Sequence, residues 1–125
     1  MAHLPGTSIH LIADLQGGIG LDDVARVEGA LRHAAEAAGA RLLSVNVYGF
    51  GEGMGVTGVA LLAESHISIH TWPETAVAAV DLFVCGQDVD AEAGLAAIVA
   101  AFGAEVTRLH RIARLGADQA RKNAR

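Results

Sequence analysis

The sequence predicts an α+β fold in which an antiparallel β-sheet carries two helices on one of its faces. Six short segments show the apolar patterns of strands, and two longer segments place apolar residues three and four positions apart, as helices do. These segments follow one another in the order β-α-β-β-β-β-α-β. Consecutive strands with short connections favour antiparallel pairing, and two helices suffice to cover one face of such a sheet.

Each expected element has its own local signal. The first helix begins after Asp22 or Asp23, whose carboxylates can cap it, and runs to about Ala38. The second helix follows Asp90 and covers 91–102. Strands are expected at 7–15, 42–48, 56–63, 66–72, 78–85 and 104–115.

The length and composition indicate one domain that spans residues 1–125. The chain is 52% hydrophobic, which supplies a core for one domain of this size. The sheet has a second face that no helix covers, and such a face needs a partner. We therefore expect a homodimer whose two sheets pack face to face and form an α/β/β/α sandwich.

Charge and cysteine content exclude several classes of protein. A net charge of −5 opposes nucleic-acid binding and suits a small cationic ligand. Cys85 is the only cysteine, so the chain has no internal disulfide, and we expect a cytoplasmic protein. The N-terminal residues lack a signal-peptide pattern, and no apolar run is long enough to span a bilayer, so we expect no membrane partner.

The segment AESHISIHTWPE is the most unusual part of the chain. Ile67 and Ile69 alternate with three polar residues, so one face of this strand carries His66, Ser68 and His70. A row of histidine and serine side chains on one strand face of a largely apolar protein requires an explanation.

A hairpin between the third and fourth predicted strands places Glu64 and Ser65 in a two-residue turn. In this register Val59 lies opposite His70, and Thr57 lies diagonal to the same histidine, within side-chain reach. The serine of the turn, the imidazole and the threonine hydroxyl are then expected to converge. Such a group of residues is suited to self-cleavage at the turn.

Two other interpretations of the histidines remain open. On a strand, the Cα atoms of His66 and His70 are about 13 Å apart. One zinc ion holds each nitrogen at about 2 Å, so the pair is poorly placed to share a metal, and we expect none. Either histidine can also be an ordinary hydrogen-bonded residue at a strand edge.

The blocks ESH at 64–66 and HTWPE at 70–74 closely resemble the bacterial and archaeal S-adenosylmethionine decarboxylase proenzymes, a pyruvoyl-dependent family. The resemblance extends to Gly55–Gly58, Ala79, Asp81–Phe83 and Cys85–Gly86, and more loosely to His10–Ala13 and the first helix.

This resemblance implies that the chain cuts itself. In the family, the serine that matches Ser65 attacks the preceding carbonyl, here that of Glu64, and forms an ester. Elimination and hydrolysis then leave a pyruvoyl group at the new N-terminus. The products would be a β chain of residues 1–64 and an α chain of residues 65–125. His70 is expected to assist, since an imidazole can remove the acidic Cα proton of an ester.

The resemblance also implies the later chemistry. The pyruvoyl group derived from Ser65 forms a Schiff base with the substrate amine and acts as an electron sink, without pyridoxal phosphate or metal. Cys85 matches the residue that returns a proton to the product carbon, although a buried structural cysteine is the alternative. Thr57 stands where the family usually has a serine that helps processing.

The substrate-binding residues implied by the resemblance are Glu74, Phe50 and Trp72. The counterpart of Glu74 hydrogen-bonds ribose hydroxyls in the family. The family's His-x-Phe-x-Pro motif is absent from residues 48–54, and the aromatic position falls on Gly51, one residue after Phe50. The glycines of this loop permit a one-residue bulge, through which Phe50 can reach an adenine.

The preferred reaction is therefore the conversion of S-adenosylmethionine to decarboxylated S-adenosylmethionine and CO2 for spermidine biosynthesis. One alternative is a pyruvoyl-dependent decarboxylase of L-ornithine or L-arginine on the same scaffold. Another is a catalytically inactive homologue with a regulatory role, against which the retention of Ser65, His70 and Cys85 argues.

Overall fold

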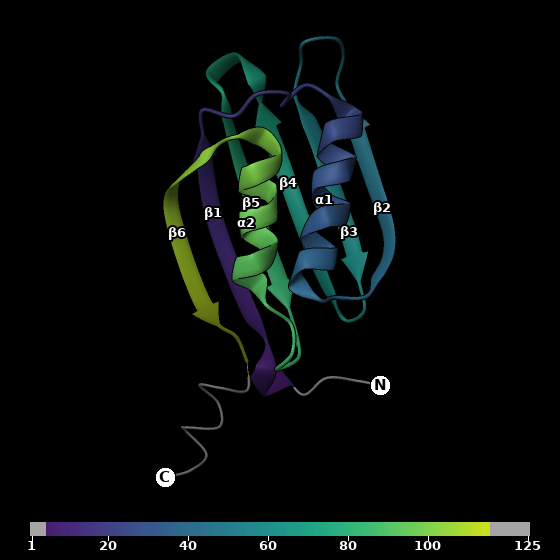
Figure 1. Ribbon diagram of the computed structural model, residues 1–125, viewed down its shortest axis with the longest axis vertical. Helices are drawn as coiled ribbons and strands as arrows, with labels where there is room; N and C mark the ends of the chain where they lie inside the picture. The colour runs from purple at the N-terminus through teal and green to yellow at the C-terminus, as the bar shows by residue number, and fades with distance from the viewer. Residues whose placement is uncertain (1–4, 116–125) are drawn as a thin grey trace.

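The computed structural model describes residues 5–115, which form one six-stranded antiparallel sheet and two helices (Figure 1). The elements in chain order are η1 (Pro5–Thr7), β1 (Ile9–Gln16), α1 (Val24–Ala38), β2 (Leu42–Gly49), β3 (Val56–Leu62), β4 (Ser65–Trp72), η2 (Pro73–Thr75), β5 (Val77–Val84), α2 (Ala91–Phe102) and β6 (Glu105–Ala113). The strands lie in the order β2-β3-β4-β5-β1-β6. The predicted fold class and element order are confirmed.

Both helices begin and end where the sequence signals them. Asp23, and not Asp22, caps α1 by accepting a hydrogen bond from the backbone amide three residues on, at 3.2 Å. Asp90 caps α2 in the same way at 3.1 Å. Gly39 and Gly103 end the two helices with left-handed φ angles of 74° and 63°, which glycine adopts without steric cost.

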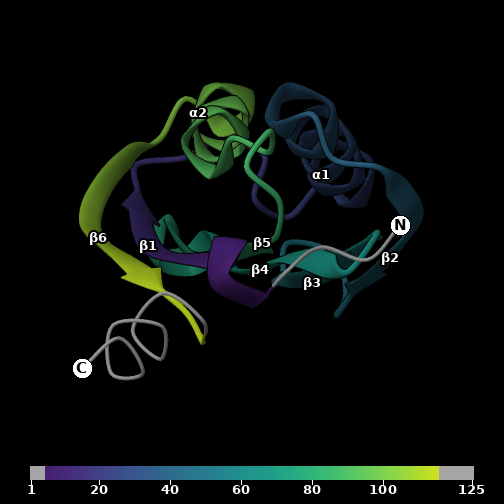
Figure 2. The same cartoon turned by 90° about the horizontal axis from the view of Figure 1, so that it is seen from below.

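The two helices lie side by side on the same face of the sheet (Figure 2). Between the helices and the sheet lies a core of aliphatic side chains and one phenylalanine, including Leu11, Leu31, Ile67, Ile69, Leu82, Ile98 and Phe102. Gly58 lets α1 approach β3 closely, because a Cβ there would lie 2.9 Å from the Leu31 side chain. Among residues 5–115, neither helix is long and apolar enough to cross a bilayer.

The other face of the sheet is not covered by any element that the structure describes. Along β4, Ile67 and Ile69 are fully buried against the helices, whereas His70 and Trp72 on the opposite face are exposed. Trp72 keeps 48% of its surface open to solvent. An uncovered face with such side chains fits the expected sheet-on-sheet homodimer, which stays a prediction.

The hairpin between β3 and β4 differs from its predicted register. Its turn residues are Ala63 and Glu64, since β4 already begins at Ser65. The pairing partner of each β4 residue moves by two positions, so Thr57 lies directly opposite His70 and not diagonal to it. A shift of two residues keeps every side chain on its predicted face.

Candidate active site

Ser65 and Cys85 lie together at the hairpin end of the sheet. The backbone amide of Cys85 donates a hydrogen bond of 3.0 Å to Ser65 Oγ, and the thiol of Cys85 donates one of 3.2 Å to the carbonyl oxygen of Glu64. Cys85 therefore contacts both the serine hydroxyl and the carbonyl next to it. A donor to the carbonyl polarises it for attack, and a donor to Oγ fixes the position of the hydroxyl.

The peptide unit before Ser65 is strained. Glu64 has a φ of 60°, in the left-handed region that residues with a Cβ rarely adopt. Such a conformation costs about 1–3 kcal/mol and persists where the surrounding structure holds it. The strained residue is the one whose carbonyl the thiol of Cys85 contacts.

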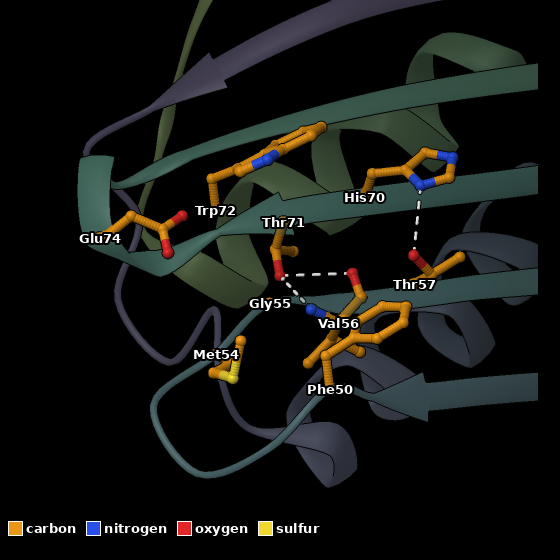
Figure 3. Close-up of a pocket in the computed structure, with 9 residues that line it drawn as sticks. All are labelled: Phe50, Met54, Gly55, Val56, Thr57, His70, Thr71, Trp72 and Glu74. Carbon is orange, nitrogen blue, oxygen red and sulfur yellow. Dashed lines mark hydrogen bonds between the residues drawn. The ribbon is translucent and has the colours of Figure 1, made fainter.

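The first residues of β3 and the last residues of β4, which lie at the end of the sheet away from Ser65, line a cavity of about 260 Å³ together with the 50–55 loop (Figure 3). The lining residues are Phe50, Met54, Gly55, Val56, Thr57, His70, Thr71, Trp72 and Glu74. His70 Nδ1 and Thr57 Oγ1 are 3.3 Å apart. Aromatic rings from a loop and from a strand, with a carboxylate and an imidazole, suit a flat cationic ligand with hydroxyl groups.

Thr71 and Gly55 hold the cavity wall together. The buried Thr71 hydroxyl donates to the carbonyl of Leu21 at 2.7 Å and accepts from the amide of Val56 at 2.9 Å. A Cβ at Gly55 would lie 2.4 Å from the carbonyl oxygen of Thr71, so only glycine permits this close approach. The base of the 50–55 loop is thus fixed against the end of β4.

A third cluster surrounds Asp81 on the uncovered face. One carboxylate oxygen contacts His10 Nε2 at 2.6 Å and His66 Nε2 at 2.9 Å, and the other accepts a short hydrogen bond from Ser68. Burial by itself raises the pKa of Asp81. The hydrogen bonds from Ser68, His10 and His66 and the charge of His66 outweigh this effect and leave the pKa below its ordinary value.

The side-chain atoms of His10, His66 and Asp81 are close enough to be considered as metal ligands. The guanidinium of Arg114 lies 2.9 Å from His10 Nδ1 and can only donate there, which places the imidazole proton on Nε2, facing Asp81. A metal-bound histidine instead usually donates its second N–H to an acceptor. The arrangement is therefore that of a hydrogen-bonded network.

The predicted convergence of serine, histidine and threonine within one chain is wrong. Ser65 is the first residue of β4, and His70 lies five residues further along it, about 16 Å away at the rise of a strand. The hydrogen bond to Ser65 Oγ comes from a backbone amide and not from a basic side chain. The structure instead shows two separate clusters, which we call the cleavage end (Glu64, Ser65, Cys85), where the predicted cleavage lies, and the pocket end (Thr57, His70 and the cavity).

Sequence reasoning missed Ser8, His10 and Met54. Ser8 contacts the Cys85 sulfur, His10 contacts Asp81, and Met54 lines the cavity. The first two contacts exist because β1 lies beside β5, a pairing between distant segments that local patterns do not reveal. Asp81 has the same parity as Cys85 along the chain, which is compatible either with a shared site or with a separately paired carboxylate. The structure pairs Asp81 with His10, His66 and Ser68.

Comparison with known proteins gives consistent results. A family model described as S-adenosylmethionine decarboxylase matches residues 9–115. The S-adenosylmethionine decarboxylase proenzyme of Thermomicrobium roseum is 44% identical over 86 residues, which are 69% of this chain and 74% of that protein. The proenzyme of the same name from Methanococcus aeolicus is 51% identical over 78 residues, which are 62% of this chain and 66% of that protein, just under two thirds of its length.

A solved structure agrees with these matches. The crystal structure of the adenosylmethionine decarboxylase from Aquifex aeolicus superimposes with a TM-score of 0.72 at 34% sequence identity. The superposition covers 86% of this chain and 88% of that one.

Proposed function

This chain belongs to the S-adenosylmethionine decarboxylase family, and we propose that it is a proenzyme that cuts itself between Glu64 and Ser65 to become a pyruvoyl-dependent decarboxylase. Its substrate is S-adenosylmethionine, and its products are CO2 and decarboxylated S-adenosylmethionine for spermidine biosynthesis in the cytoplasm. The observation that carries the proposal is the double contact of Cys85 with the two residues of the cleaved bond.

The cleavage follows from the groups at that bond. Ser65 Oγ attacks the Glu64 carbonyl carbon, so a C–O ester bond forms and the peptide C–N bond breaks. Removal of the Ser65 Cα proton then expels the Glu64 carboxylate. Addition of water releases the serine nitrogen as ammonia and leaves a carbonyl at residue 65. The thiol of Cys85 supports the first step, because its hydrogen bond stabilises the oxyanion that develops on the Glu64 oxygen.

The residues at the cleavage end fit the pyruvoyl group that this reaction would leave. The group would supply an electron sink for the electrons released when CO2 departs. Cys85 is 8% exposed, so it is shielded from bulk water next to residue 65. A shielded thiol in this position is suited to return one proton to the product carbon.

The pocket end supports a nucleoside substrate. Phe50 and Trp72 supply two aromatic rings at the cavity, and Glu74 adds a carboxylate suited to ribose hydroxyls. Phe50 lies at the cavity although it precedes the family's aromatic position by one residue. The relatives named for S-adenosylmethionine further support this substrate over L-ornithine or L-arginine.

A second copy of the chain accounts for the separation of the cleavage end from the pocket end. The uncovered sheet face carries Thr57 and His70 at one end of β4, and the bond between Glu64 and Ser65 lies at the other end, where β4 begins. In a two-fold dimer with stacked sheets, both subunits contribute the same surface to the interface. If the strands of the two sheets run in opposite directions, the pocket end of each chain lies over the cleavage end of its partner.

This arrangement gives two complete sites per dimer, each built from both chains. His70 of one chain then supplies the base that Ser65 of the other chain lacks. A stable interface buries about 1,600 Å² in total, an area that one face of a six-stranded sheet can offer. The proposed homodimer is therefore required for cleavage as well as for covering the sheet.

The substrate is tested by measuring CO2 release from S-adenosylmethionine, L-ornithine and L-arginine with fully cleaved protein. We expect release from S-adenosylmethionine alone. Release only from a basic amino acid would overturn the substrate and keep the cleavage mechanism. No release from any of the three by fully cleaved protein would leave the inactive homologue as the better description.

A further inference from the structure

Ser8 is buried directly against the sulfur of Cys85. Its side chain lies one residue before β1, and its Oγ is 3.2 Å from Cys85 Sγ although the two residues are 77 positions apart. Only 2% of Ser8 is exposed. Neither the sequence patterns nor the cleavage chemistry described above assigns this serine a role.

The direction of the hydrogen bond follows from the other contact of the thiol. The single proton of the Cys85 thiol is donated to the carbonyl of Glu64 at 3.2 Å. Sulfur can then only accept from Ser8, so the serine hydroxyl is the donor. A buried hydroxyl that lacked this acceptor would carry a desolvation cost, which makes the orientation stable.

The residue before Ser8 contacts the residue after Cys85. The Thr7 hydroxyl accepts a hydrogen bond from the amide of Gly86 at 3.0 Å. Two successive residues just before β1 therefore contact two successive residues just after β5. After cleavage, Thr7 and Ser8 belong to fragment 1–64, whereas Cys85 and Gly86 belong to the other fragment, so these contacts join the two.

We propose that Ser8 is a positioning residue that holds the Cys85 sulfur and stabilises its negative charge when the thiol gives up its proton. This inference rests on the proposed function. In that step the S–H bond of Cys85 breaks, a C–H bond forms on the product carbon, and the electron pair stays on sulfur. The Ser8 hydroxyl already points at that sulfur, so it stabilises the thiolate without reorganisation.

Ser8 becomes more important once the chain is cut. The Glu64 carbonyl, the other partner of the thiol, then belongs to a free carboxylate at the end of its fragment. Ser8 stays attached to β1 and keeps the sulfur beside residue 65. Without the hydrogen bond from Ser8, the Cys85 thiol delivers its proton less often to the product carbon. Abortive transamination then competes: the substrate nitrogen stays on residue 65, which becomes alanyl, and the product leaves as an aldehyde.

The test compares Ser8→Ala with wild type and with Ser44→Ala, a serine on the exposed part of β2. In cleaved protein, we expect Ser8→Ala to lower kcat about five- to tenfold, the loss that corresponds to one neutral hydrogen bond. KM should stay unchanged. Mass spectrometry of fragment 65–125 should show more alanyl N-terminus per CO2 released than in either control.

A second measurement, by Raman spectroscopy, does not require an active enzyme. Cys85 is the only thiol of the chain, so the Raman S–H stretching band of uncleaved Ser65→Ala protein reports on this sulfur alone. Adding Ser8→Ala to that background should shift the band, because one hydrogen-bond partner is lost, whereas adding Ser44→Ala should not.

An unshifted band together with an unchanged ratio of alanyl N-terminus to CO2 released would overturn the role of Ser8. A lower melting temperature with an unchanged alanyl-to-CO2 ratio would also overturn it and assign Ser8 a purely structural part. If wild-type protein neither cleaves nor releases CO2, the proposed function fails instead, and the Raman result still decides whether the Ser8 contact exists.

Discussion

His70 and Thr57 lie directly opposite each other on β4 and β3, with 3.3 Å between His70 Nδ1 and Thr57 Oγ1. The pair stands about 16 Å along β4 from Ser65. Within one chain it therefore cannot take part in cleavage, whereas in the proposed dimer it faces the cleavage end of the partner. In that proposed arrangement, the site is complete only when both chains contribute to it.

Mixed dimers test this arrangement. Ser65→Ala and His70→Ala homodimers should both stay uncut, because each lacks one group in both of its sites. A mixed dimer, purified through two different tags, contains one site with Ser65 and His70 both present. We expect the His70→Ala chain in it to be cut and the Ser65→Ala chain to stay whole, as seen on denaturing gels. Fully uncut mixed dimers, or rapid cutting of the His70→Ala homodimer, would contradict the arrangement.

The aromatic wall of the cavity should control substrate affinity. Phe50→Ala removes a ring on which adenine can stack, so it should weaken S-adenosylmethionine binding by about 1–3 kcal/mol, on the analogy of base stacking in nucleic-acid-binding proteins. Tyr48 lies 5.1 Å from Phe50 between ring centroids and does not line the cavity, so Tyr48→Ala serves as the matched control with a smaller effect. Isothermal titration with Ser65→Ala protein measures both, and equal losses would contradict a direct role for Phe50.

Two glycine substitutions should change stability in opposite directions. Gly55→Ala places a methyl group 2.4 Å from the carbonyl oxygen of Thr71, so it should lower the free energy of unfolding by about 1–3 kcal/mol. Gly29 lies inside α1 with no atom near its missing Cβ, so Gly29→Ala should raise the free energy of unfolding by about 0.5–1 kcal/mol. Urea unfolding measures both values. A stable Gly55→Ala protein would show that the loop base is not fixed as described.

The network around Asp81 should make stability depend on pH in acid. The pKa of Asp81 is below its ordinary value of 3.8, so its ionised form stabilises the fold above that pH, and this contribution is lost as pH falls through the lowered pKa. The difference in unfolding free energy between wild type and Asp81→Asn should therefore shrink as the pH is lowered from 5 to 2. Ser68→Ala, which removes one of the hydrogen bonds that lower the pKa, should reduce this dependence in part. A constant difference across that range would contradict the network.

Local signals explain why the fold could be predicted. The N-caps Asp23 and Asp90, the left-handed glycines and the alternation in β4 each depend on neighbouring residues only. The sheet order does not depend on neighbouring residues alone, because β1 inserts between β5 and β6 through contacts between distant segments. The contacts of Ser8 and His10 follow from that insertion, and the sequence alone could not reveal them.

The candidate site was predictable in its residues but not in its arrangement. The motif identified Ser65, His70 and Cys85, and the structure brings only Ser65 and Cys85 together. The hairpin turn was misplaced by one residue because Glu64 takes a positive φ, which a non-glycine residue does not signal. In the proposed dimer the site is divided between two chains, and such a division cannot be recognised from spacing along one chain.

Self-cleavage is tested most directly by denaturing mass spectrometry of purified wild-type protein after long incubation. The account predicts two fragments, residues 1–64 with a free carboxylate and residues 65–125 with a pyruvoyl group in place of the serine N-terminus, while Ser65→Ala stays whole. A wild-type chain that remains intact, with no carbonyl group that reacts with hydrazine reagents, would contradict it.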